Sequence, residues 1–236
     1  MGIVTRKRKR SEVLTSESSG TEFSHELLEN TVLYLLSRGI ETLALKNNSY
    51  EQCSTAFEGL IKPGIPMFVY LRRIVDLINQ WAKQVEAMDG AYCEEQNLSA
   101  GITHLFVALV YIERLQLCGK VVLNEKSIHR VVLTSMLLAH KFLEDKRLGN
   151  EWFSKVGGVT KKELCELEKS FCQACDWKLL VHVNDFQQIK AKTLKTFTTA
   201  ISSRPNGKRQ RNSLDLKVNS RYQHTFIGSA PSVSAF

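Results

Sequence analysis

The chain has 236 residues, of which 43% are apolar and 24% charged, an ordinary composition for a globular protein with one core. No apolar segment reaches the roughly 20 residues of a membrane-spanning helix, since the longest run, Leu105 to Ile112, ends at a glutamate. The first residues are charged rather than apolar, so we expect no signal peptide. We therefore expect the protein in a reducing compartment, with its six cysteines as free thiols.

The formal net charge of +8 is concentrated at the two ends. Residues 1–10 carry five basic and no acidic groups, and residues 190–236 carry nine basic groups and one acidic group. Residues 11–189 therefore hold 18 basic and 23 acidic groups, a net charge of −5. Because a nucleic-acid-binding domain carries its basic excess on the fold itself, we expect no nucleic-acid or membrane binding through the folded core.

The first 20 residues, rich in Ser, Glu and basic groups, predict a disordered basic arm. It contains five consecutive cations, Arg6, Lys7, Arg8, Lys9 and Arg10. Such a run is typical of a nuclear import signal, and a solubilising tail is the alternative. We expect the protein in the nucleus and the cytoplasm.

The next segment, residues 21–65, predicts a helical extension. Ser24 can cap a helix that Gly39 would end, and a weaker helical pattern follows over residues 40–45. Most of residues 47–66 read as a connection because prolines and glycine interrupt them.

Helical spacing of apolar residues then predicts a helix over residues 68–82 and a second over 100–117. A polar loop containing Gly90 separates them. Ser99 precedes the second helix, and Gly119 closes it.

The stretch from Ser127 to Asp145 is helical in period and apolar on nearly every side, which indicates a helix in the middle of a bundle. Lys141 lies where this apolar stretch ends, beside Phe142. A charged group there is either a surface anchor or half of a recognition pair.

Residues 146–159 predict an irregular loop that ends in two glycines. Thr160 and Glu163 have the spacing of a capping box, which predicts a helix to about Asp176 with Glu168 at the edge of its apolar face. A further amphipathic helix is predicted from 184 to about 201. Residues 202–236 lack any period and predict a disordered basic tail.

The chain lacks the common catalytic patterns, including a phosphate-binding glycine loop, G-x-S-x-G and H-E-x-x-H. Cys172 and Cys175, with Cys165 and His182 nearby, could in principle hold zinc. The pair lies within an amphipathic helix without a second C-x-x-C, which favours core thiols. We expect no enzyme activity, no cofactor and no metal.

Five sequence blocks, in order, resemble the cyclin box of the P/U-type cyclins of plants and their fungal phosphate-pathway relative. They are YLRRI (70–74), FVALVYIERL (106–115), IHRVVLTSMLLAHKFLED (128–145), SKVGGVTKKELCELEKSF (154–171) and WKLLVHVNDF (177–186). The resemblance implies an all-α protein with a single five-helix cyclin box at 66–185. The N-terminal extension at 21–65 and a C-terminal helix at 186–201 would flank this box.

The resemblance also implies a regulatory subunit that binds and activates a cyclin-dependent kinase as a heterodimer, with a role in the cell cycle or cell division. In cyclins, a lysine on the third box helix and a glutamate on the fifth bind the kinase's C-helix, and these match Lys141 and Glu168. Apolar candidates for the same surface are Leu137, Leu138, Phe142 and Leu164. Local ion pairs, such as Lys141 with Asp145, and ordinary core packing are the alternatives.

The chain departs from the family in places. The first box helix reads LRRIVDLI without the tryptophan used for substrate docking, and His140 stands where a small residue is usual. A cyclin-fold adaptor in transcription and a helical scaffold without kinase activation are alternative functions. Cell division, phosphate signalling and morphogenesis are all open as cellular roles.

Overall fold

The computed structural model describes residues 18–47, 55–89 and 98–202. These residues form seven helices and no strand. The helices are α1 (Ser18–Lys46), α2 (Met67–Asp89), α3 (Ala100–Leu117), α4 (Ile128–Leu143), α5 (Asn150–Gly157), α6 (Lys161–Ala174) and α7 (Val183–Ser202). The predicted all-α class is confirmed. The predicted arm at 1–20 lies mostly, and the basic cluster at 6–10 and the tail from 203 wholly, outside the described residues.

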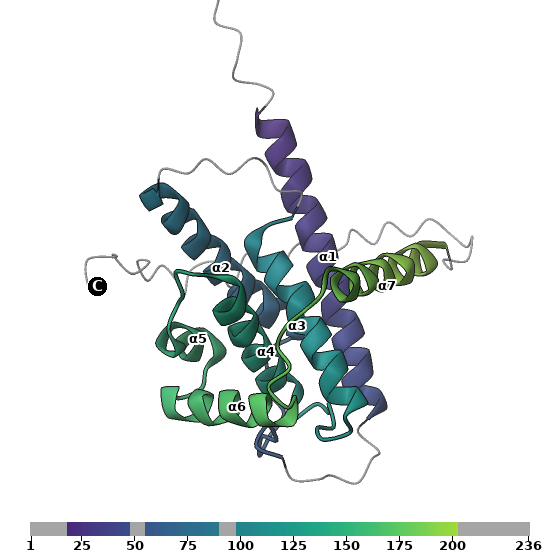
Figure 1. Cartoon of the computed structure of the whole chain (residues 1–236). Helices are drawn as coiled ribbons and strands as arrows, with labels where there is room; N and C mark the ends of the chain where they lie inside the picture. The colour runs from purple at the N-terminus through teal and green to yellow at the C-terminus, as the bar shows by residue number, and fades with distance from the viewer. Residues whose placement is uncertain (1–17, 48–54, 90–97, 203–236) are drawn as a thin grey trace, which may run out of the picture.

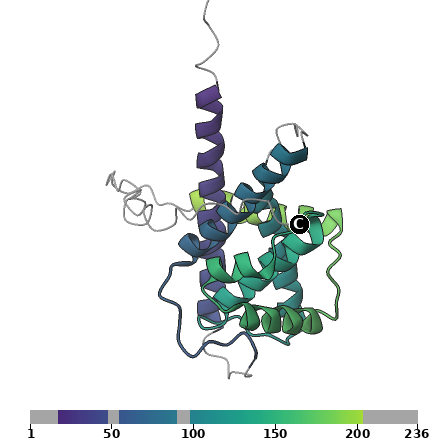
Figure 2. The same ribbon diagram turned by 90° about the vertical axis from the view of Figure 1, so that its left-hand side faces the viewer.

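Helices α3 and α4 lie in the middle of the bundle and pack against each other, with the other helices around them (Figure 1). From Ile128 to His140 every residue of α4 except Arg130 is buried. This confirms the prediction that a helix apolar on nearly every side lies at the centre. The N-terminal half of α1 extends beyond the bundle (Figure 2).

Helix α3 is the one described helix long and apolar enough to cross a membrane by length and composition. In the fold, 61% of that window is buried inside the protein. Packing at the centre of the bundle accounts for its apolar composition.

Two predicted helix starts are confirmed by their capping contacts. The Ser99 hydroxyl accepts a hydrogen bond from the Ile102 amide, and the Thr160 hydroxyl accepts one from the Glu163 amide at 3.1 Å. Each bond satisfies an amide that has no partner within the first turn of its helix.

The prediction that Gly39 ends the first helix is wrong, because α1 continues through it to Lys46. Leu33, Leu36 and Ile40 form a buried stripe on both sides of the glycine. Their burial outweighs the cost of about 1 kcal/mol for glycine within a helix. Ser24, predicted as the cap, lies inside the same helix.

The prediction of an irregular loop over 146–159 is also wrong in part, because it contains α5. This helix has only eight residues and buries few side chains, chiefly Phe153, so its apolar pattern is too short to predict a helix. Gly158, in the left-handed conformation with φ 68°, ends it.

Candidate functional site

Lys141, near the end of α4, and Glu168, in the middle of α6, form an ion pair. The Lys141 Nζ lies 2.6 Å from Glu168 Oε1, and the two side chains are 29% and 21% exposed. The sequence alone left open local pairs within each helix, but the structure joins these two residues across 27 positions of the chain. The pair forms because α4 and α6 pack against each other.

Asn150, the first residue of α5, holds the same carboxylate from the other side. Its Nδ2 donates to Glu168 Oε2 at 2.8 Å and lies 3.4 Å from Cys165 Sγ. Both oxygens of the Glu168 carboxylate are therefore engaged. The sequence analysis did not identify Asn150, because α5 itself was not predicted.

The apolar residues predicted for the site divide into two groups. Leu137, Leu138 and Leu164 are at most 3% exposed, so the structure places them in the core. Their burial favours the alternative of ordinary core packing over a binding surface. Phe142 is different, because 47% of it is exposed beside Lys141, and the neighbouring Leu143 is 43% exposed.

His140 precedes Lys141 and is fully buried. Its Nε2 accepts a hydrogen bond from the Leu148 amide at 2.9 Å. Burial, with the nearby His104 ring, lowers the pKa of His140 to about 4, so the ring is neutral at pH 7.

His104 of α3 also reaches the end of α4. Its Nε2 lies 3.2 Å from Glu144 Oε1, close enough for an ion pair although off the hydrogen-bonding direction. The imidazole lowers the pKa of the Glu144 carboxyl. Glu144, the first residue of the loop that follows α4, is thereby fixed to α3.

The cysteines in the described part of the chain show no metal-site geometry. Cys172 and Cys175 are buried, whereas Cys165 is exposed. Burial raises the pKa of the Cys175 thiol to about 11, so it stays protonated at neutral pH. Among the described residues no group of three or more His, Cys, Asp or Glu side chains could hold a metal ion.

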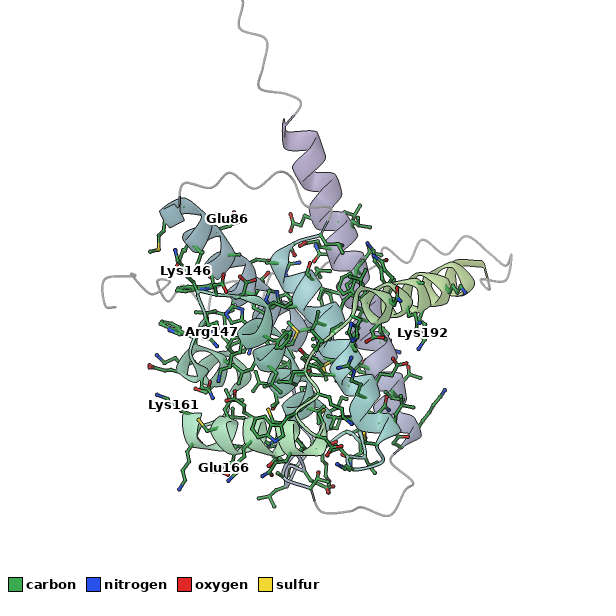
Figure 3. All side chains as sticks on the ribbon, in the orientation of Figure 1. Glu86, Lys146, Arg147, Lys161, Glu166 and Lys192 are labelled. Atoms are coloured by element: carbon green, nitrogen blue, oxygen red, sulfur yellow. The ribbon has the colours of Figure 1, made fainter. Side chains whose placement is uncertain are left out.

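Charged residues surround the outer edge of this region. Figure 3 shows Lys146 and Arg147 on the loop between α4 and α5, and Lys161 at the start of α6, along one edge of the molecule. Lys192, on α7, lies at the opposite edge. The candidate site consists of Lys141, Phe142, Asn150 and Glu168, which α4, α5 and α6 supply.

The family model named Cyclin matches residues 11–179. The chain belongs to the cyclin family.

The relatives narrow the family to the P/U-type cyclins, as the sequence blocks predicted. The chain is 30% identical to Cyclin-U4-3 of Arabidopsis thaliana over 154 residues, covering 65% of this chain and 60% of that protein. It is 25% identical to Cyclin-P3-1 of Oryza sativa subsp. japonica over 195 residues, with 82% and 73% covered. With PHO85 cyclin-7 of Saccharomyces cerevisiae it shares 32% identity over 146 residues, with 56% and 44% covered.

Proposed function

We propose that this cyclin binds a cyclin-dependent kinase as a heterodimer and activates it by holding the kinase's C-helix in the active position. The observation that carries the proposal is the Lys141–Glu168 pair, fixed across two helices and beside the exposed Phe142. The cyclin resemblance assigns these two residues to the kinase contact. Their meeting in the fold supports that assignment.

The pair has hydrogen-bonding capacity left for a partner. A lysine ammonium has three donors, and a carboxylate has about four acceptor positions, of which the described contacts use one and two. The remaining donors and acceptors suit unpaired backbone carbonyls and amides at the end of a partner helix. Because the side chains are already held in place, little ordering entropy is lost on binding.

Activation then requires differential binding of two kinase states. A kinase whose C-helix is displaced lacks its Lys–Glu ion pair, and a rigid surface that fits only the inward helix shifts that equilibrium. Taking a kinase from almost wholly inactive to almost wholly active requires about 5.5 kcal/mol. Two desolvated charges and an aromatic anchor are the kinds of contacts that contribute energies of this size.

The test is co-purification from the source cell with wild-type protein and with the double variant Lys141→Ala, Glu168→Ala. The kinase recovered is identified and its activity assayed. Arg130→Ala, which breaks another bridge between the same two helices, is the matched control. We expect active kinase with the wild type and the control and none with the double variant. Equal recovery from all three would favour a scaffold that does not use this site.

We also propose that the five cations from Arg6 to Arg10 direct the protein into the nucleus as well as the cytoplasm. The support is their uninterrupted run in the sequence. Deleting residues 1–10 from a fluorescent fusion should lower its nuclear fraction. An unchanged distribution would remove the proposal.

A further inference from the structure

His140 is buried one position before the lysine of the candidate site, and its ring is held on several sides. The ring centroid lies 5.3 Å from that of His104 on α3 and 5.5 Å from that of Phe153 on α5. Its one hydrogen bond among the described residues is the one that Nε2 accepts from the Leu148 amide at 2.9 Å. A histidine is thus placed where its acceptor nitrogen fixes the backbone of another segment.

That segment is the loop over residues 144–149, which joins α4 to α5. Three of its residues are tied to different helices. Glu144 lies 3.2 Å from His104, the Lys146 carbonyl accepts from Trp81 Nε1 at 2.9 Å, and the Leu148 amide donates to His140. The bond to His140 is the last of the three before α5 begins, so it is the one nearest to Asn150.

Asn150 begins α5 but does not cap it. Asparagine is among the preferred cap residues, yet the cap position is occupied by Gly149, without a side-chain capping bond. The Asn150 amide instead donates to Glu168 Oε2 at 2.8 Å. Its position two residues after Leu148 means that the place of the Leu148 amide determines whether this bond can form.

We propose that His140 and Asn150 are positioning residues of the kinase-recognition site. His140 fixes the Leu148 amide, this places Asn150, and Asn150 holds the Glu168 carboxylate in the orientation that a partner binds. The inference rests on the proposed function for its consequence, but the arrangement of the three residues can be measured without a partner.

The state of the His140 ring follows from this role. A neutral imidazole that carries its proton on Nδ1 can accept the hydrogen bond from the Leu148 amide at Nε2. A protonated ring carries a proton on both nitrogens and has no acceptor. The groups facing the ring are His104 from α3 and Glu144 and Arg147 from the loop. The ring must therefore stay neutral for the loop to keep its position.

The first experiment measures the affinity of the co-purifying kinase for full-length variants at a temperature where all are folded. We expect Asn150→Ala and His140→Ala to weaken binding about ten- to 150-fold, the range of a lost hydrogen bond to a charged group. His140→Gln, whose side-chain oxygen can replace the Nε2 acceptor, should restore most of the affinity. His129→Ala, another histidine buried on α4, is the matched control and should bind as the wild type does.

The second experiment follows the free protein by NMR. In His140→Ala, exchange of the Leu148 amide should be about tenfold faster. The side-chain NH₂ signals of Asn150 should move to those of a free amide, and His140→Gln should reverse both changes. Unchanged Leu148 exchange and Asn150 signals in His140→Ala would overturn the proposed positioning.

The two proposals fail in different ways. If the variant Lys141→Ala, Glu168→Ala loses the kinase while Asn150→Ala and His140→Ala bind it normally, the positioning role is wrong and the proposed function stands. If the double variant binds normally, the proposed function fails, and the NMR measurement still decides whether His140 places Asn150.

Discussion

Helix α4 carries two similar tripeptides, His-Arg-Val at 129–131 and His-Lys-Phe at 140–142, placed 11 residues apart. Eleven residues are close to three helical turns, so both lie on one side of the helix. In each, the cation reaches a glutamate of α6. Arg130 Nε lies 2.8 Å from Glu163 Oε1, and the Lys141 bridge to Glu168 measures 2.6 Å.

The two bridges differ in what covers them. Val131 is fully buried, and Gly59 lies so close to Arg130 that a Cβ there would overlap the guanidinium. At the other end, Phe142 is 47% exposed, and Asn150 supplies a third contact. The bridged side chains themselves are similarly exposed, so the burial of an ion pair does not distinguish the proposed recognition site from the other bridge. The exposed ring of Phe142 and the third contact from Asn150 do distinguish it.

The largest effect should come from reversing one charge in each bridge. Lys141→Glu places two carboxylates together at the proposed kinase contact, and we expect affinity to fall by about 2–5 kcal/mol, or at least thirtyfold. Arg130→Glu should lower the melting temperature but leave kinase affinity within about threefold of the wild type. Affinity measured by titration, alongside thermal melts, separates the two. Equal loss of affinity in both variants would contradict the distinction between the bridges.

The two histidines should respond differently to acid. The pKa of His140 falls from its ordinary 6.5 to about 4 in the folded protein, so the unfolded chain takes up the proton first. The stability it contributes is present above pH 6.5 and is lost as the pH falls towards 4, up to about 3 kcal/mol. Urea unfolding at several pH values should show the free energy of unfolding falling between pH 6.5 and 4. In His140→Gln this dependence on pH should be weaker.

His129 provides the control for that measurement. Burial lowers its pKa as well, but its Nε2 donates to the Ile65 carbonyl at 3.0 Å, a bond that a protonated ring keeps. His129→Gln should leave most of that dependence on pH in place. If the dependence of unfolding free energy on pH disappears in His129→Gln and persists in His140→Gln, then His129 and not His140 causes it.

A smaller effect is expected from the residue after each cation. Phe142→Ala removes an exposed ring, and we expect a loss of kinase affinity of about 1–2 kcal/mol with little change in stability. Val131→Ala opens a cavity in the core and should cost about 1–3 kcal/mol of stability with unchanged affinity. Isothermal titration would measure the kinase affinity of both variants, and urea unfolding their stability. A loss of affinity in Val131→Ala or a loss of stability in Phe142→Ala would contradict the prediction.

The smallest effect concerns the start of α6. Thr160→Ala removes the hydroxyl that accepts a hydrogen bond from the Glu163 amide, and we expect a cost of about 1 kcal/mol in stability. Thr160→Ser, which keeps the hydroxyl, should restore it. Kinase affinity should not change, because the contacts of Glu168 lie beyond the first turn of the helix. A loss of affinity in the folded variant would mean that the two bridges are coupled through α6.

The sequence predicted the central helix well and its surface poorly, for the same physical reason. A helix that is apolar on nearly every side is recognised as buried, but its apolar residues do not mark one distinct face. Leu137 and Leu138 therefore could not be told from the exposed Phe142 until the neighbouring helices were placed. The Lys141–Glu168 assignment came from the cyclin resemblance, because local pairs were equally compatible with the residues alone.

Asn150 and α5 could not have been predicted in this way. An eight-residue helix with few buried side chains gives too short a pattern to read, and the contact from Asn150 to Glu168 spans 18 positions. The sequence did not show that α1 continues through Gly39, because the buried residues that stabilise this part of the helix do so by packing against other helices. In both cases tertiary contacts decide a local structure.

The end of α5 limits how this sequence can diverge. Gly158 needs its left-handed backbone, but Gly157 is restricted by space, because a Cβ there would overlap the Leu133 side chain of α4. A larger residue at 157 requires the Leu133 side chain to move or to be replaced by a smaller one. Positions 133 and 157 should therefore covary among relatives, and a substitution at 133 alone would leave a gap beneath the helix that carries Asn150.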